Sequence, residues 1–265
     1  MTAPRAEIGI FGGSGFYSLL ESGVKHQVTT AYGDPSAPLV VGTIAGRSVA
    51  FLPRHGVDHE FPPHRIPYQA NLAAMRDLGV TQVIAPCAAG SLQIDVRPGH
   101  FVVVDQLVDR TSGRPQTFHD SGAVHVSFAD PYCPRGRAAA LDAAREVGIT
   151  VHDGGTMVVI EGPRFSTRAE SKWYAEQGWS VINMTGHPEA VLARELGLCY
   201  TSVALITDHD AGVDDGASVT MDEVFRVFAD NNERLRVLLF ALIARLPSSG
   251  EDCACPAAPT VGQVT

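Results

Sequence analysis

The most constraining feature of this sequence is the stretch at residues 182–190, where an apolar run ends in small polar residues just before a helix-like segment. Pro188 suits the first turn of that helix, because its missing N–H would have no partner there. In an open α/β sheet, ligands bind where a strand ends before a helix N-terminus, and the outward N–H groups favour an anion. Thr185 adds a hydroxyl to such a site, and Met184 adds an apolar surface for a flat ring or a sugar face. The alternative is a plain strand-to-helix turn with Met184 in the core.

Apolar runs and amphipathic patterns predict strands and helices over most of the chain. We expect strands at residues 7–11, 39–44, 48–52, 83–86, 101–107, 156–160 and 200–207, and helices at 67–78, 134–147, 167–176, 189–196 and 222–246. The length of 265 residues and the hydrophobic content of 45% suit one large core, so residues 1–246 are predicted to form a single α/β domain. Residues 247–265 are predicted to be a disordered tail.

The charge and the apolar pattern exclude some classes of protein. The formal net charge of −9 argues against a nucleic-acid surface, so any phosphate that binds is expected to be a small anion held by local groups. No apolar run reaches the length of about 18 residues that a membrane span needs. The first residues lack the apolar core of a signal peptide, and we expect a cytoplasmic protein.

Two further stretches follow strand-like runs and could bind an anion. Residues 12–15 (GGSG) permit close approach of the backbone, and Ser14 supplies a hydroxyl. The alternative is a dinucleotide-binding turn, but the G-x-G-x-x-G spacing is not met cleanly. Arg54 offers a planar fork that matches phosphate oxygens, and His55 adds a donor beside it. The alternative for Arg54 is a solvated side chain on a surface loop.

Three histidines at positions 55, 59 and 64 raise the question of a metal site. Gly56 and the two prolines at 62–63 preclude a regular helix that would present them on one face. We therefore expect no metal there.

The five cysteines are an odd number, and the chain is long enough to fold without a disulfide scaffold. Cys87 and Cys199 lie in strand-like segments and are interpreted as reduced core residues. Cys253 and Cys255 form a close pair in the polar tail, which could be redox-active or bind a metal. The favoured interpretation is a disordered tail with incidental thiols.

Asp208 and Asp210 follow the apolar run at residues 200–207. Two nearby carboxylates cannot both ionise cheaply, so burial side by side is expected to raise the pKa of Asp208 above its ordinary value of about 3.9. Such a group can donate a proton at neutral pH. The alternative, two solvated loop aspartates, fits poorly at the carboxyl end of a buried strand.

The order of three motifs, EGPRFSTRAES from residue 161, NMT-x-x-PE from residue 183 and TDxD from residue 207, resembles the methylthioadenosine phosphorylase branch of the purine nucleoside phosphorylases. The resemblance continues at residues 12–15, 53–56, 68–71 and 109–111, and it covers about residues 5–246. It implies an α/β single domain with a central mixed, partly barrel-like β-sheet flanked by helices. It also implies a homotrimer with sites between subunits.

The implied reaction is phosphorolysis of 5′-methylthioadenosine to adenine and 5-methylthioribose 1-phosphate, in purine and methionine salvage. Inorganic phosphate is then a co-substrate, and no metal or other cofactor is expected. Alternatives left open are a phosphorylase of 6-oxopurine nucleosides or methylthioinosine, a nucleotide-binding oxidoreductase built on residues 12–15, and a non-catalytic nucleoside sensor.

The resemblance also implies a role for each matching residue. The phosphate would be bound by Ser14, Arg54, His55, Cys87, Ala88 and Thr185, although Cys87 stands where the family usually has Thr or Ser. The nucleoside would be bound by His59, Phe165, Ser166, Met184, Asp208, Asp210, Met221, Val224 and Phe225, and the 5′ pocket of a neighbouring subunit would be reached by His125. Asp208 and Asp210 are the catalytic candidates. The 6-oxopurine enzymes carry Asn at the position of Asp208, and the mammalian-type ones carry Glu at the position of Ser166, so both residues indicate a 6-aminopurine.

Overall fold

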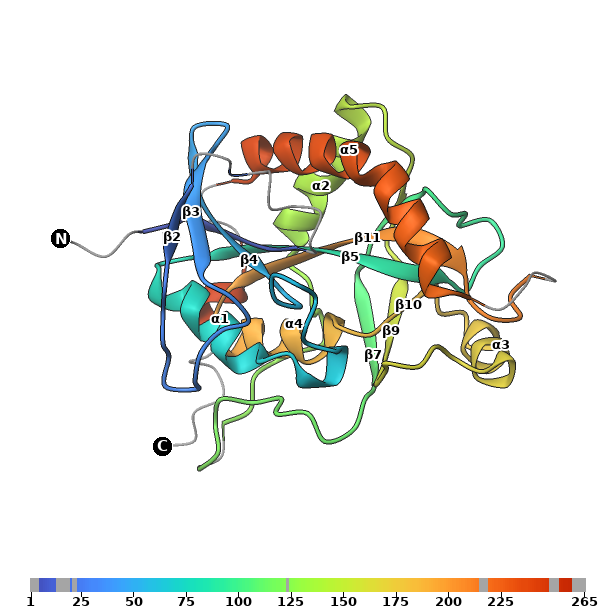
Figure 1. Cartoon of the computed structure of the whole chain (residues 1–265), viewed down its shortest axis with the longest axis horizontal. Helices are drawn as coiled ribbons and strands as arrows, with labels where there is room; N and C mark the ends of the chain where they lie inside the picture. The colour runs from blue at the N-terminus through green and yellow to red at the C-terminus, as the bar shows by residue number, and fades with distance from the viewer. Residues whose placement is uncertain are drawn as a thin grey trace.

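The computed structural model describes residues 5–12, 20, 23–122, 124–214, 219–247 and 253–258. These residues form a mixed, eleven-stranded sheet with helices on both faces, which confirms the predicted fold class (Figure 1). The strands are β1 (Ile8–Gly12), β2 (Val24–His26), β3 (Leu39–Ile44), β4 (Arg47–Pro53), β5 (Gln82–Ser91), β6 (Phe101–Val103), β7 (Gln106–Arg110), β8 (Val151–Asp153), β9 (Thr156–Ile160), β10 (Val181–Asn183) and β11 (Cys199–His209). The helices are α1 (Tyr68–Asp77), α2 (Pro134–Glu146), α3 (Arg168–Glu176), α4 (Gly186–Glu195) and α5 (Met221–Arg245), with short 3-10 turns η2 (Pro63–Arg65) and η3 (Cys255–Ala257).

Strand β5 lies at the branch point of the sheet. It pairs in parallel with β1 and β11 and antiparallel with β10. The pairing with β11 has a register shift between Ile206 and Asp208, where Ile206 faces Ala89 and Asp208 faces Gly90. A bulge of this kind redirects a side chain beside a functional site. The carboxyl end of β11 thus presents Asp208 beside the end of β5.

The single strand predicted at residues 101–107 is wrong. The structure divides it into β6, which pairs with β11 and β8, and β7, which pairs with β9. Residues 104–105 turn the chain from one part of the sheet to the other, and Asp105 Oδ1 accepts a hydrogen bond from the Gly155 N–H at this turn. Strands β2 and β8 were not predicted, because three residues are too few to show an alternating pattern.

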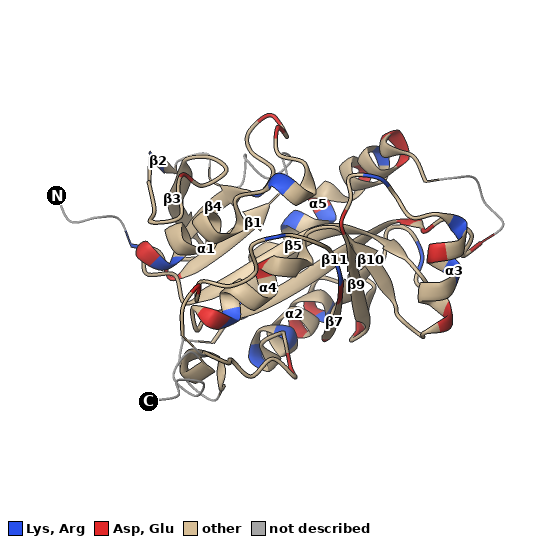
Figure 2. Cartoon of the chain, turned by 90° about the horizontal axis from the view of Figure 1, so that it is seen from below, with Lys and Arg blue, Asp and Glu red and all other residues tan. Residues whose placement is uncertain are grey.

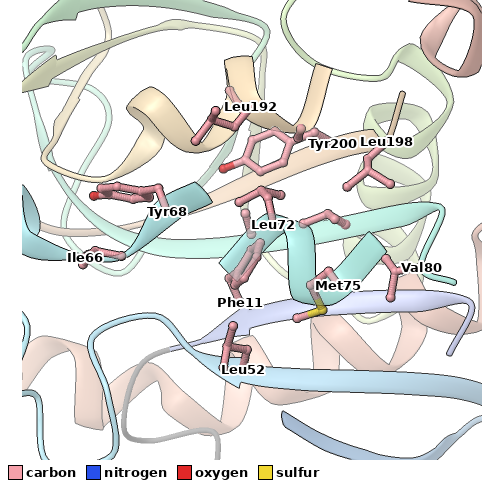
Figure 3. Packing of buried hydrophobic residues seen from close by; sticks show 14 of the residues in the cluster. Phe11, Leu52, Ile66, Tyr68, Leu72, Met75, Val80, Leu192, Leu198 and Tyr200 are labelled. Atoms are coloured by element: carbon pink, nitrogen blue, oxygen red, sulfur yellow. The ribbon is translucent and has the colours of Figure 1, made fainter. Parts of the chain in front are cut away.

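The core has one layer on each face of the sheet. Helices α1 and α4 pack on one face, and α2 and α5 pack on the other. Figure 3 shows part of the first layer, where Phe11 of β1, Leu72 of α1 and Tyr200 of β11 come together from three elements. Phe11 and Leu72 are fully buried, and such a side chain stabilises the fold by about 1.5–3 kcal/mol.

The predicted helices agree with the structure to within a few residues, except at the start of α4. That helix begins at Gly186, but His187 has the non-helical angles φ −117° and ψ 135°. The regular turns therefore begin near Pro188, close to the predicted start. Among the described residues, no helix is long and apolar enough to cross a bilayer. Positions of both charge signs lie along the helices and loops (Figure 2).

The predicted disordered tail is wrong for residues 253–258. This segment lies against the body of the protein, and Cys255 is buried there beside Cys133 and Cys199. The burial of an apolar thiol cluster explains the difference, since the tail sequence taken alone shows no partner for its cysteines. The prediction for residues 248–252 and 259–265 lies outside the described residues.

Candidate active site

One cavity of about 250 Å³ gathers almost every predicted site residue. It lies at the ends of β4, β5, β10 and β11 and is bordered by the loop at 59–63, the loop at 163–166 and the start of α5. The predicted residues that line it are Arg54, His55, His59, Cys87, Ala88, Phe165, Ser166, Met184, Thr185, Asp208, Asp210, Met221, Val224 and Phe225. Ser14 lies outside the described residues, and His125 is exposed and away from this cavity.

Asp208 and Asp210 form the acidic end of the cavity, and they are 6% and 3% exposed. The Thr207 hydroxyl donates to Asp208 Oδ2 at 2.7 Å, and the Ser171 hydroxyl donates to Asp210 Oδ2. Burial raises the pKa of Asp208 to about 6, while the hydrogen bond from Thr207 opposes this and the charge of Asp210 adds to it. Desolvation is thus the leading cause, whereas the sequence argument relied on the neighbouring carboxylate. Burial also raises the pKa of Asp210.

Gly90 allows the close packing at this end. A Cβ atom at this position would lie 2.9 Å from Asp208 Oδ1 and 3.0 Å from Ile182 Cγ2. Any larger residue would have to displace the carboxyl group. Gly90 was not identified from the sequence, because its requirement comes from strands β10 and β11, far away in the chain.

Arg54 is buried at another part of the cavity wall and is already paired. Its Nε and Nη2 donate to the two carboxylate oxygens of Glu189 at 2.6 and 2.8 Å, and its Nη1 donates to the Pro86 carbonyl at 3.2 Å. The Tyr200 hydroxyl donates to the same carboxylate at 2.8 Å. A guanidinium has five N–H groups, so these bonds to described residues account for three of them. The sequence analysis missed Glu189 and Tyr200.

His55 lies next to Arg54 in the cavity wall and is neutral at pH 7. Burial lowers its pKa to about 4, and the nearby Arg54 charge lowers it further, although its Nδ1 contacts the Phe61 carbonyl at 2.9 Å. Burial likewise raises the pKa of the Cys87 thiol to about 11, so this side chain is also uncharged. Because the Phe61 carbonyl can only accept, the single N–H of neutral His55 is on Nδ1 and its Nε2 is an acceptor. The anion-binding candidates are therefore mostly neutral groups around one buried guanidinium.

The N–H groups before α4 differ from the prediction. Those of Thr185 and Gly186 both donate to Asn183 Oδ1, at 2.6 and 2.7 Å, and do not point outward to an anion. The Asn183 amide donates in turn to the Ala88 carbonyl at 3.1 Å, which ties β10 to β5. Thr185 itself lies in the cavity wall, and its hydroxyl also donates to Asn183 Oδ1 at 3.4 Å.

The connection after β7 is fixed to the site by Arg114. This buried guanidinium donates to the backbone carbonyls of Met184 and His187 at 2.9 and 2.7 Å, and to that of Glu161 at 2.6 Å. The Gln116 side chain contacts His187 Nε2 at 2.9 Å. The loops on either side of the cavity are thus joined at Met184, whose side chain lines it.

The opposite part of the cavity is apolar and partly open. The rings of His59 and Phe225 meet edge to face with centroids 6.1 Å apart, and His55 and His59 stack at 4.3 Å. Met221 and Phe225 at the start of α5 are 47% and 48% exposed. This arrangement can hold a small apolar group.

Comparisons with known proteins agree with this geometry. The family model described as the phosphorylase superfamily matches residues 7–244. This chain belongs to the phosphorylase superfamily. It is 58% identical to a protein of Streptomyces coelicolor named purine nucleoside phosphorylase, over 96% of this chain and 94% of that one. It is also 58% identical to the S-methyl-5′-thioadenosine phosphorylase of Mycolicibacterium smegmatis, over 88% of each chain.

The solved structures point the same way. The methylthioadenosine phosphorylase of Schistosoma mansoni, in complex with adenine, superposes with a TM-score of 0.91 at 37% identity, over 97% of this chain and 98% of that one. A variant of the same enzyme in complex with methylthioadenosine also gives 0.91. The superfamily catalyses transfer of pentosyl groups, so the chain is an enzyme of this kind and the oxidoreductase and sensor alternatives lose their support.

Proposed function

We propose that this enzyme catalyses phosphorolysis of 5′-methylthioadenosine to adenine and 5-methylthioribose 1-phosphate, in purine and methionine salvage. The observation that carries the proposal is the presence of a buried acid with a raised pKa and an apolar, partly open wall in one cavity. The buried acid can donate a proton to a leaving purine, and the apolar wall can contact a methylthio group. Inorganic phosphate is the co-substrate, and the reaction as proposed needs no other cofactor.

In the proposed reaction an oxygen of phosphate bonds to C1′ of the ribose while the bond from C1′ to the purine breaks. The electron pair of that bond moves into the purine, and protonated Asp208 donates to N7 as it leaves. A carboxyl group that faces N7 as a donor and the exocyclic amine as an acceptor selects adenine. Phe165 and Met184, which line the cavity, supply apolar surface for the ring and the ribose.

The phosphate is proposed to bind among Arg54, His55, Cys87, Ala88 and Thr185, together with Ser14 from outside the described residues. Their position in one wall supports this assignment. The two N–H groups of Arg54 that bond neither Glu189 nor Pro86 are the charged donors of the set.

A second candidate is a phosphorylase of 6-oxopurine nucleosides or methylthioinosine. It is favoured by the name of the relative from Streptomyces coelicolor. Ser166 and Asp208 in the cavity favour the 6-aminopurine instead, because a 6-oxopurine needs a donor that faces O6.

We also propose a homotrimer in which His125 reaches the site of a neighbouring subunit. The exposed Met221 and Phe225 at the cavity support this, because a neighbour would cover them. The cytoplasmic location expected from the sequence stays a prediction.

The deciding experiment measures the free base that is released, adenine from 5′-methylthioadenosine and adenosine and hypoxanthine from methylthioinosine, each with phosphate and with sulfate in its place. We expect phosphate-dependent release, fastest for 5′-methylthioadenosine. Release at equal rates without phosphate would contradict phosphorolysis, and a preference for methylthioinosine would favour the second candidate.

A further inference from the structure

Four of the five cysteines come together outside the active site, from three segments that are far apart in the sequence. Cys133 precedes α2, Cys199 begins β11, and Cys253 and Cys255 belong to the C-terminal segment. Their four sulfur atoms all lie within 4.8 Å of one another, and the sulfurs of Cys199 and Cys253 are 3.4 Å apart. Cys133, Cys199 and Cys255 are buried, and Cys253 is partly exposed.

The spacing of the sulfur atoms fits a metal tetrathiolate. In a tetrahedral zinc site each Zn–S bond is about 2.3 Å, which separates the sulfurs by about 3.8 Å. A disulfide instead joins two sulfur atoms at about 2.05 Å, and it does not require any other sulfur atom to lie nearby. Here each of the four thiols is close to all three others, and all four are free.

The surroundings of the cluster favour negatively charged sulfur. Cys133 is the residue immediately before the first turn of α2, where backbone N–H groups have no partner within the helix. The positive end of a helix stabilises an anion at this position. The guanidinium of Arg135 lies 3.9 Å from Cys253 Sγ. These groups offset part of the double negative charge of a divalent ion with four thiolates.

We propose that Cys133, Cys199, Cys253 and Cys255 bind one zinc ion. A set of four thiolates is typical of a closed structural zinc site, because it leaves no position for a substrate. None of the four residues lines the active-site cavity, so the ion has no part in the proposed reaction. Each thiol that binds the ion loses its proton to solvent, and no oxidation is involved.

The expected consequence is that zinc fixes the C-terminal segment to the body of the enzyme. The ion joins residues 253–258, which follow α5 in the sequence, to the start of α2 and the start of β11. Because the ion binds the folded chain better than the unfolded one, it raises the stability. This differs from the sequence-based expectation that the protein holds no metal.

The test begins with the unmodified full chain, produced in zinc-supplemented medium and purified with a thiol reductant and without chelators. Elemental analysis should find about one zinc per chain, as a single closed site requires. Cys253→Ser and Cys255→Ser should each lose at least about tenfold in zinc affinity, since even residues that only support a ligand are worth about 10–100-fold. Cys87→Ser is the matched control for zinc content, because Cys87 lies outside the cluster.

A second measurement uses the unmodified chain after the metal is removed under reducing conditions. Added Co²⁺ should give the intense absorption bands of a tetrahedral cobalt–thiolate site, with an end point at one ion per chain, and added zinc should abolish them. The proposal is overturned if the reduced protein takes up neither ion. It is also overturned if the purified chain holds iron instead, or if its mass is lower by the four hydrogen atoms that two disulfides would remove.

Discussion

Replacement of Asp208 by Asn tests whether burial of this carboxyl group lowers the free energy of unfolding at neutral pH. The pKa of Asp208 rises from an ordinary value of 3.8 to about 6 in the folded chain. A raised carboxyl pKa means that the folded state prefers the protonated form, so the associated stability is full below 3.8 and is lost as the pH rises through 6. The difference corresponds to about 3 kcal/mol above pH 7, because one pKa unit is worth about 1.4 kcal/mol. Asn removes the charge and keeps an acceptor for the Thr207 hydroxyl.

The measurement is the free energy of unfolding of both forms by urea at several pH values. Asp208→Asn should gain stability relative to the unmodified enzyme as the pH rises, by about 1–1.5 kcal/mol between pH 5 and pH 8. The change of this stability difference with pH reports on the pKa. A difference that is the same at every pH reflects the free energy of burying the amide in place of the carboxyl group. A difference that stays the same from pH 5 to pH 8 would refute a raised pKa at Asp208.

The same pair of proteins reports on catalysis. If protonated Asp208 donates to the purine, kcat/KM of the unmodified enzyme should fall by about tenfold per pH unit above pH 7. The titration of phosphate affects both forms equally, so the ratio of the two kcat/KM profiles isolates Asp208. A ratio that does not change between pH 6 and pH 8 would remove Asp208 as the proton donor.

Four further outcomes follow from the site. Asp208→Asn should shift the ratio of kcat/KM values toward methylthioinosine over 5′-methylthioadenosine, and an unchanged ratio would mean that Asp208 does not read the base. Arg54→Ala should destabilise the fold by about 3–5 kcal/mol, because it leaves Glu189 buried without its partner; adding Glu189→Gln should restore stability but not the KM for phosphate, and recovery of both would make Arg54 purely structural. Gly90→Ala should lower kcat by displacing Asp208, at a cost in stability of about 1–3 kcal/mol measured by urea, and full activity would contradict the packing. The apolar wall should favour the methylthio group over the hydroxyl of adenosine by about 1–3 kcal/mol in kcat/KM, and equal values would mean that this wall does not contact the 5′ group.

Most of the candidate residues lie in one cavity because they follow strands that the sequence marks locally. The motifs at residues 53–56, 161–166, 183–185 and 207–210 each follow a strand, and the sheet brings those strand ends together. A strand end before a loop is recognisable without knowledge of its neighbours. The helical pattern at residues 222–246 predicted α5, and the resemblance indicated Met221, Val224 and Phe225, which line the cavity from the first turn of that helix.

What the sequence could not show are pairings between distant segments. Arg54 and Glu189 are separated by 135 positions, and neither position carries a local pattern that reveals the other. The cluster of four cysteines likewise needs α2, β11 and the tail to be placed first. The outward N–H groups predicted before α4 were wrong for a related reason, because the Asn183 side chain turns back to bind them.

The pairing of Arg54 with Glu189 also bears on how the proposed reaction would work. Its guanidinium charge is balanced by a buried carboxylate, and His55, with a pKa of about 4, is neutral at pH 7. A phosphate bound there would therefore be oriented by hydrogen bonds without being neutralised by several free cations. In the proposed transition state the sugar carries positive charge, and an adjacent anion that keeps its own charge stabilises it most effectively at low dielectric. Extra positive charge in this wall would tighten phosphate binding in the ground state but would weaken that stabilisation, so in the proposed reaction the buried ion pair would favour turnover over affinity.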